Sequence, residues 1–370
     1  MLEWPDSDYE PDPVSKPIVV IGAGIAGLAS AWELARRGAQ VEVLERGTPG
    51  QEASWAGAGI LSLLLPWNYP APLRALTEHS QALYPDWIDA IHKTAAIDPE
   101  YRRTGMLIRA PYDRAQAETG FAGQAATVAP AALTGFGPGL WLPEVAQVRN
   151  PRLLQALLEG LRRLGVTIHS EIGTISLTTQ ANRVTAAVSG DRRWPADQFV
   201  VATGAWSANL LDQHAAGLPI RPIRGQMLLY RTEPGRLPCI LYEAGQYLVP
   251  RADGHILAGS TLEDVGFDKT TTVEARDRLH GFMSRLLPDV AASGPIRHWA
   301  GLRPGAPDNI PIIARHPILE NLFVNSGHFR YGVTLAPASA ELLADLMTGK
   351  TPEPTLRLFA WPDIIRAAPV

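Results

Sequence analysis

The chain has 370 residues, of which 46% are hydrophobic and 19% are charged, and its formal net charge at pH 7 is -4. This length predicts about two domains with sizeable cores, and the weak negative charge argues against nucleic acid or an anionic membrane as a partner. Cys239 is the only cysteine. A single thiol excludes a disulfide framework and a thiolate metal site, and it is typical of a protein of the reducing cytoplasm.

Residues 1–16 are acidic and contain proline, without a basic start or an apolar centre. This pattern predicts a disordered tail and neither a signal peptide nor an anchor. No apolar run in the sequence is long enough to cross a membrane, and no cluster of metal-ligating residue types is visible. We therefore expect a soluble, cytoplasmic protein without a metal site.

A buried strand, a tight turn and a helix are predicted over residues 18–38. Gly22, Gly24 and Gly27 follow the apolar strand with the spacing G-x-G-x-x-G. In such a unit the first glycine allows a sharp turn, the second lets backbone N–H groups approach a diphosphate, and the third lets the helix pack on the strand. The second strand, 41–45, ends in Glu45, whose carboxylate can hold a ribose diol. The unit predicts a dinucleotide site.

Small residues dominate the next stretch, 46–60. A loop this apolar is expected to be covered, and small side chains let its backbone lie against a flat or phosphorylated ligand. The competing interpretation is a flexible loop.

Helices and strands alternate through the middle of the chain. Helices are expected at 73–92 and after Asn150, which we expect to be the N-cap, with Pro151 in the first helical position. Short strands and Gly/Pro connections fill 101–148, a strand is expected at 166–170, and hairpin-like sequence continues to residue 188. The apolar strand 199–202 runs into the glycine of a second helix start.

The sequence changes character after residue 220. Strands are expected at 226–231, 246–250, 255–259, 297–302 and 322–325, a Gly/Pro loop at 303–307, and helices at 272–287 and about 337–348. The first of these helices has an apolar face composed of Val273, Leu279, Phe282, Met283 and Leu286.

The cofactor is expected to be FAD. An NAD enzyme would continue its first βαβ unit with further βα repeats, whereas here a small-residue loop, a distant strand–glycine segment at 199–207 and a glycine-rich helix start near the C-terminus follow. The expected fold class is α/β, an FAD-binding Rossmann-like domain with an inserted α+β domain built on an antiparallel sheet. The expected FAD domain comprises 17–92, 145–220 and 301–350, the substrate domain 93–144 and 221–300, and residues 351–370 form a C-terminal tail.

Six segments carry a resemblance over roughly residues 17–350. In order, they read ERGTPGQEASWAGAG, VVATGAWS, RPIRGQM, GQYLVPRADG, WAGLRPG and GHFRYG. With this order and spacing the chain resembles the glycine oxidases of thiamine biosynthesis, within the D-amino-acid oxidase and sarcosine oxidase group.

The resemblance implies oxidation of glycine, sarcosine or a small D-amino acid by hydride transfer to flavin. The imine is then hydrolysed to a 2-oxo acid, and O2 is reduced to H2O2. It also implies a homotetramer. Besides the glycines and Glu45, the FAD positions that it implies are Ile25, Ala26, Arg46, Ala53, Ser54, Ala58, Gly59, Ile60, Thr174, His328, Phe329, Arg330, Tyr331, Gly332, Val333 and Thr334.

The resemblance also places Tyr247, Arg303 and Arg330 against the substrate, as the catalytic set. An arginine fork can hold an α-carboxylate with two parallel charge-assisted hydrogen bonds, and Tyr247 can add a phenol hydrogen bond. The helix that starts near Gly332 can direct N–H groups at a reduced, anionic flavin. His328 is either a proton relay or a structural residue.

Two positions depart from the family pattern. Tyr331 stands where asparagine is common, so the pocket wall or its gate is expected to differ, and Leu262 replaces a methionine near the substrate. Cys239 does not fall where sarcosine oxidases attach flavin, which favours non-covalent FAD. The alternatives left open are a sarcosine oxidase, a D-amino-acid dehydrogenase with an acceptor other than oxygen, and a flavin-carrying subunit without turnover.

Overall fold

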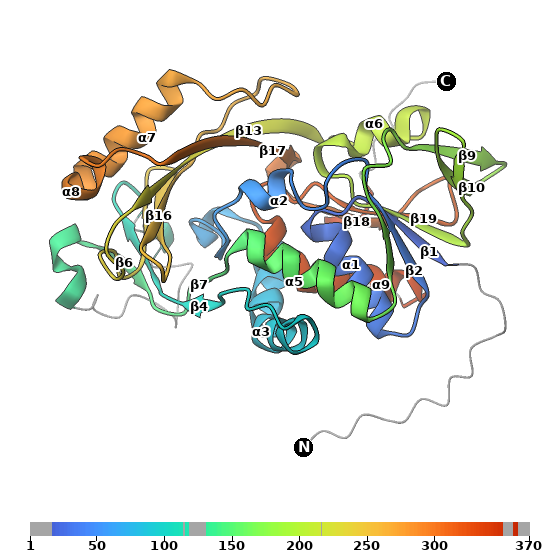
Figure 1. The fold of residues 1–370 in the computed structure, drawn as a ribbon, viewed down its shortest axis with the longest axis horizontal. Helices are drawn as coiled ribbons and strands as arrows, with labels where there is room; N and C mark the ends of the chain where they lie inside the picture. Colours follow the sequence, from blue (N-terminus) through green and yellow to red (C-terminus); the bar gives the residue numbers. More distant parts are fainter. Residues whose placement is uncertain (1–16, 114, 118–130, 216, 351–357, 362–370) are drawn as a thin grey trace, which may run out of the picture.

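The structure is a computed structural model that describes residues 17–113, 115–117, 131–215, 217–350 and 358–361 (Figure 1). The tail predicted for residues 1–16 lies outside these ranges. No helix within them is sufficiently long and apolar to span a bilayer.

A six-stranded sheet is the centre of the first half of the molecule. Its strand order is β18 (Ile312–Arg315), β19 (Leu322–Ser326), β12 (Gln198–Val201), β1 (Ile18–Ile21), β2 (Val41–Leu44) and β8 (Thr167–His169). All neighbouring strands are parallel except β18, which runs antiparallel to β19. The strands have nearly continuous apolar sequences because both faces of the sheet are covered.

Alternate residues of β1 pack into two separate cores. Val20 packs with the helices α1 (Ile25–Arg36), α3 (Ala71–Ala95), α5 (Asn150–Arg163) and α9 (Gly332–Met347). Val19 and Ile21 pack on the opposite face with the small sheet β11 (Arg192–Trp194), β10 (Arg183–Ser189) and β9 (Ser176–Gln180). Figure 1 shows this layering, with α1, α5 and α9 on one side of the strands and β9 and β10 on the other.

A seven-stranded, mostly antiparallel sheet forms the second half. Its order is β17 (Arg297–Gly305), β13 (Arg221–Arg231), β16 (His255–Gly259), β15 (Gln246–Pro250), β14 (Ile240–Glu243), β5 (Met106–Arg109) and β6 (Gly139–Leu142). The helix α7 (Val273–Leu286) packs on β13, β15 and β16, with α8 (Pro288–Ala291) behind it. The long strands β13 and β17 run from this sheet toward the first half (Figure 1).

Short elements connect the two halves. A three-stranded sheet joins β3 (Ile60–Leu61), β7 (Ala146–Gln147) and β4 (Arg102–Arg103). The remaining short helices are α2 (Ala53–Ala56), α6 (Ser207–Leu211), η1 (Pro66–Asn68), η2 (Ala131–Phe136), η3 (Gly204–Trp206), η4 (Asp212–His214) and η5 (Pro307–Asn309). The α/β fold class with a second antiparallel sheet is as predicted. The predicted domain boundaries remain a proposal, because β4 pairs across one of them.

The structure differs from the sequence-based expectations at three elements: β17, α9 and β14. The loop predicted at 303–307 is strand as far as Gly305, because β17 continues to pair with β13 through Arg303 and Pro304. The predicted last helix begins at Gly332, five residues early, and Pro337 lies inside it; the Val333 carbonyl, which would accept from the backbone of residue 337, accepts from the Tyr84 hydroxyl instead. The strand β14 was not predicted.

Two helix predictions were wrong in detail. Asn150 is not the N-cap of α5, since Arg149 occupies that position without a side-chain cap. The Asn150 side chain is buried instead and donates from Nδ2 to the Ser54 carbonyl at 2.7 Å. On α7, Val273 is 60% exposed and lies outside the apolar face, because it is the first residue of the helix.

The described part of the predicted C-terminal tail packs against the rest of the protein. Phe359 is fully buried in the core beneath the first sheet, and the Trp361 ring lies 4.7 Å from the His316 ring. Residues 351–357 and 362–370 lie outside the described residues.

Candidate active site

One elongated cavity runs from the first sheet to the second, along the carboxyl ends of β1, β2 and β12. A ligand crevice at this edge of a parallel sheet is the general position for nucleotides in such folds. Every predicted cofactor and substrate residue except Gly27 lines it: Gly22, Gly24, Ile25, Ala26, Glu45, Arg46, Ala53, Ser54, Ala58, Gly59, Ile60, Thr174, Tyr247, Arg303, His328, Phe329, Arg330, Tyr331, Gly332, Val333 and Thr334.

The glycine turn shapes one wall of the cavity. Gly22 has φ +106°, and a Cβ there would lie 2.5 Å from the Ala202 carbonyl oxygen. Gly27 does not line the cavity, so its role is in packing: a Cβ on Gly27 would overlap the Gly22 carbonyl. Only glycine allows α1 to start this close to β1 and β12, which brings the helix N-terminus to the cavity wall.

Glu45 is fixed at the end of β2 by backbone donors. Its Oε2 accepts from Ala23 N at 2.9 Å and its Oε1 from Gly47 N at 3.0 Å. Each carboxylate oxygen has a further lone pair. The side chain is therefore placed to accept from a hydroxyl in the cavity.

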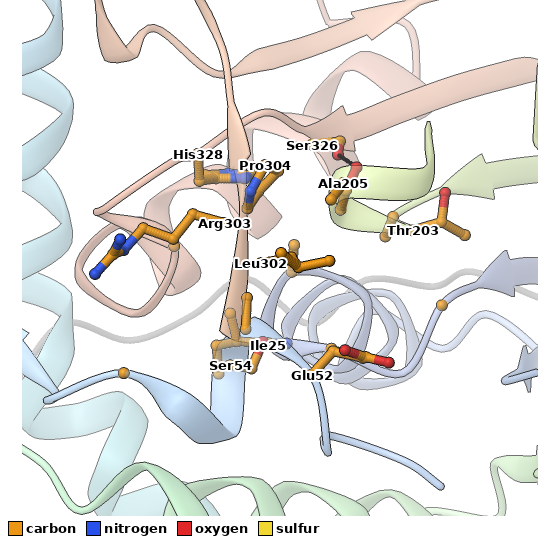
Figure 2. A pocket seen from close by; sticks show the side chains of 18 of the residues that line it. Ile25, Glu52, Ser54, Thr203, Ala205, Leu302, Arg303, Pro304, Ser326 and His328 are labelled. Carbon is orange, nitrogen blue, oxygen red and sulfur yellow. Dashed lines mark hydrogen bonds between the residues drawn. The ribbon is translucent and has the colours of Figure 1, made fainter. Parts of the chain in front are cut away.

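Ser54 joins the small-residue loop to the start of α1. Its Oγ accepts from Ile25 N at 2.9 Å, and Ser54 and Ile25 lie together in Figure 2. A helix N-terminus with an adjacent hydroxyl is suited to a phosphate group. The loop predicted to be covered is thus one wall of the cavity.

The end of the cavity near Thr174 is lined by aromatic and cationic groups. The Arg46 guanidinium lies over the Trp206 ring, 3.8 Å from its centroid. Trp206, Asn209 and Leu210 were not singled out as site residues, although Trp206 lies in the quoted segment VVATGAWS. A flat planar surface of this kind suits a heteroaromatic ring.

The opposite end gathers two arginines and a tyrosine. Arg303 projects away from Leu302 and Pro304 (Figure 2) and donates from Nη1 to the Thr261 carbonyl at 3.1 Å. Tyr247, on strand β15 of the same seven-stranded sheet, is 7% exposed. Burial lowers the pKa of the Arg303 guanidinium; the Tyr247 phenol opposes this shift, whereas the charge of Arg330 adds to it. Two cations lie at one cavity end, and no carboxylate within the described part of the chain is bonded to Arg303, which favours an anionic ligand.

His328 is buried beside this end, and burial lowers its pKa to about 4. Its Nε2 has no hydrogen-bond partner within the described part of the chain. The imidazole is thus neutral near pH 7, with one nitrogen free for a ligand.

Tyr331 forms the floor where the family pattern has asparagine. It is 1% exposed, its hydroxyl is hydrogen-bonded to that of Tyr69, and it accepts from Leu64 N at 3.4 Å. The two rings meet edge to face with centroids 5.4 Å apart. Tyr331 lines the cavity, and its effect on the pocket wall or gate stays a prediction. Leu262 is 56% exposed and absent from the described cavity lining, so its predicted place near the substrate is wrong.

The residues present fit FAD. The cavity offers a helix N-terminus, a fixed carboxylate, a planar surface and a second helix start at Gly332. The buried Asn325 Oδ1 and His328 Nε2 that lack partners belong to residues lining the same cavity. No cluster of metal-ligating side chains occurs among the described residues.

Comparison with known proteins places the chain in a family. The model for FAD-dependent oxidoreductases (DAO) matches residues 17–346. Glycine oxidase of Pseudomonas aeruginosa is 39% identical over 92% of this chain and 96% of its own length. A bifunctional ThiO/ThiG protein of Synechocystis is 31% identical and is matched over 53% of its length.

Solved structures agree with this assignment. Glycine oxidase from Geobacillus kaustophilus superposes with a TM-score of 0.84 at 26% identity, covering 94% of this chain and 98% of that one. L-proline dehydrogenase from P. horikoshii shares the fold, with a TM-score of 0.81 at 21% identity over 96% of this chain and 98% of that chain. The predicted resemblance to glycine oxidases is confirmed, and the chain belongs to the DAO family of FAD-dependent oxidoreductases.

Proposed function

We propose that the protein is a glycine oxidase that acts on glycine, sarcosine and small D-amino acids, with O2 as electron acceptor. The observation that carries this proposal is the convergence of Arg303, Tyr247 and Arg330 at one end of the nucleotide cavity, beside the start of α9. This arrangement suits a short amino acid with a free carboxylate. The name of the curated Pseudomonas relatives, at 39% identity, supports the same activity.

Bound FAD supplies a two-electron acceptor for the substrate C–H bond. Arg303 would hold the substrate carboxylate with two N–H donors of its fork, since one Nη1 proton is already used on the Thr261 carbonyl. Tyr247 would donate its phenol proton to the same carboxylate in place of its 3.5 Å contact with Met227 Sδ. Binding at two points fixes the direction of the Cα–H bond.

The neutral His328 and the start of α9 would act on the cofactor side. Gly332, Val333 and Thr334 line the cavity in the first turn, where helical N–H groups lack intrahelical partners. These dipoles favour negative charge on a group placed there. A neutral His328 would add no third cation beside Arg303 and Arg330.

The finer parts of the proposal concern how FAD is attached, how many chains assemble and where the protein is located in the cell. Cys239 is buried in β-sheet packing away from the cavity, and burial raises the pKa of its thiol to about 12, which favours non-covalent FAD. A homotetramer, a cytoplasmic location and a role in thiamine biosynthesis are proposed on the likeness to glycine oxidases and to ThiO/ThiG proteins.

Oxygen consumption and H2O2 formation with glycine, sarcosine and D-alanine test the proposal. We expect stoichiometric H2O2 with glycine. Turnover with an artificial acceptor but without H2O2 would favour a dehydrogenase, and a flavin that glycine cannot bleach under anaerobic conditions would favour a subunit without turnover. Acid precipitation checks attachment, because non-covalent FAD leaves a yellow supernatant.

A further inference from the structure

The segment RPIRGQM, residues 221–227, does not line the cavity, and it lies directly behind Arg303. Strand β13 carries this segment and pairs antiparallel with β17, which carries Arg303. Gly225 lies beneath the Arg303 guanidinium, because a Cβ built on Gly225 would overlap the Nη1, Cζ and Nη2 atoms. The absence of a side chain at this position is therefore a condition for the observed orientation of Arg303.

The residues on either side of Gly225 point to the other face of the strand, as alternation requires. Arg224 is 4% exposed and donates from Nε to Glu263 Oε2 at 2.9 Å and from Nη1 to Asp268 Oδ2 at 2.7 Å. Gln226 is fully buried and donates from Nε2 to Glu263 Oε1 at 2.9 Å. Both side chains thus bind the same carboxylate, that of Glu263.

The segment that includes Glu263 also supplies the acceptor for Arg303. Arg224 and Glu263 exchange backbone hydrogen bonds of 2.8 and 3.0 Å, and Gln226 N donates to Thr261 Oγ1 at 2.9 Å. The Thr261 carbonyl then accepts from Arg303 Nη1 at 3.1 Å. The position of this carbonyl is therefore set by the contacts of Arg224, Gln226 and Glu263.

The same contacts keep the Glu263 carboxylate occupied and so leave N–H donors of Arg303 without a carboxylate partner. Glu263 is a carboxylate whose charge raises the pKa of Arg303, yet its two oxygens are bonded to Arg224 and Gln226. The remaining N–H groups of the Arg303 fork are thereby kept for a ligand carboxylate.

We propose that Gly225, Arg224, Gln226 and Glu263 form a seat that positions Arg303 for the substrate carboxylate and so determines selectivity for amino acids over amines and esters. Gly225 acts by leaving room for the guanidinium. Arg224, Gln226 and Glu263 are positioning residues that act through Thr261. This inference rests on the proposed function of Arg303.

The test compares Gly225→Ala with Gly281→Ala in the FAD-loaded enzyme. Gly281 lies in α7 with no atom within 4 Å of an added Cβ, so it controls for the substitution itself. Two quantities are measured. The first is the ratio of kcat/KM for glycine to kcat/KM for its ethyl ester. The second is the Kd of glycolate, a carboxylate with a hydroxyl in place of the amine, from the flavin absorbance change.

Gly225→Ala should lower the glycine-to-ester ratio about 100-fold, since displacing a positioning group by about 1 Å costs that much. The loss with glycine should arise through KM more than through kcat, and the glycolate Kd should rise by a similar factor, while Gly281→Ala keeps wild-type values. An equal loss of kcat/KM for glycine and for its ester, or an unchanged glycolate Kd, would contradict the proposal that the seat positions Arg303. If Gly225→Ala does not fold, Glu263→Gln decides by the same quantities, with an expected change of about 10-fold. Wild-type enzyme that binds glycolate but does not oxidise glycine would contradict the proposed function and leave the seat standing.

Discussion

Arg303 is the residue on which the proposed substrate binding depends most directly. Its charge is disfavoured by burial and by Arg330, and it is supported by hydrogen bonds to the Thr261 carbonyl and the Tyr247 phenol but by no bonded carboxylate among the described residues. A guanidinium in this situation gains most when an anion arrives, because the anion satisfies the remaining donors and offsets the like charge. Substrate binding should therefore relieve an electrostatic cost of the free enzyme.

Arg303→Ala should raise KM for glycine about 100-fold, or about 3 kcal/mol, because the two-point hold on the carboxylate is lost. FAD content should stay at the wild-type level, since the substituted side chain lies at the substrate end. Arg303→Lys serves as control: a single ammonium cannot reproduce the fork, so most of the loss should persist. Glycine kinetics like those of wild type in the alanine variant would contradict the assignment.

The buried His328 gives the protein a pH-dependent stability. Its folded pKa of about 4 lies below the ordinary value of 6.5, so the unfolded chain binds a proton that the folded chain does not. The free energy of unfolding should thus fall by about 3 kcal/mol as the pH decreases from about 6.5 to 4. Denaturant titration of wild type and His328→Gln between pH 6.5 and about 4 measures this free energy, which should depend less steeply on pH in the variant. Parallel curves would refute the buried neutral state.

Elements were predictable where a local pattern alone determines them. The G-x-G-x-x-G turn, β1, α1 and β2 depend on close backbone packing and on an apolar strand, both visible in the sequence. The end of β17 was not predictable, because Pro304 and Gly305 read as a loop locally and are strand only through pairing with β13. Asn150 was misplaced for a similar reason, since its amide bonds to Ser54, far away in the sequence.

The site shows the same division. The glycines and Glu45 carry a chemical signature, and Arg303 was identified through the resemblance of its flanking segment. Trp206, Asn209 and Leu210 line the cavity through tertiary packing that no spacing rule reports. The seat behind Arg303 joins β13 to residues 261–263, and only the folded chain brings these together.

Arg251 joins the two halves at the element scale. It is 8% exposed, donates from Nη1 to Gln147 Oε1 at 2.7 Å and to Val148 O at 2.9 Å, and donates from Nη2 to Ala58 O at 2.8 Å. It therefore fixes the small-residue loop of the cavity to the end of β15, the strand that carries Tyr247.

Arg251→Ala should leave these three acceptors unpaired, destabilise the protein by about 3 kcal/mol and weaken FAD binding. Thermal unfolding of the FAD-loaded enzyme and flavin fluorescence on dilution measure the two effects. The exposed Arg231, at the end of β13, gives the matched control Arg231→Ala, which should change neither. Unaltered flavin retention in Arg251→Ala would show that the loop is held by other contacts.

The two sheets contribute different residues to the cavity. The six-stranded sheet presents the helix N-terminus and Glu45, whereas the seven-stranded sheet contributes Tyr247 and, through the long strand β17, Arg303. The substrate end lies where the two sheets meet, so small rotations between them would alter the distance from Arg303 to the start of α9.

The proposed tetramer is a prediction at this scale. Light scattering of the purified holoenzyme should give four times the protomer mass of 40.0 kDa. Measurement across a dilution series separates a stable tetramer from a concentration-dependent one. A mass of 40.0 kDa at all concentrations would contradict it.

The strand order of the first sheet has a consequence for biosynthesis. β1, the first strand to leave the ribosome, lies between β2 and β12, and β12 in turn needs β19, which is synthesised near the end of the chain. Loop closures of this span are slow and expose unpaired strand edges in the meantime. The first sheet therefore cannot be completed until β19 has left the ribosome, and we expect the nascent chain to bind flavin only after that point.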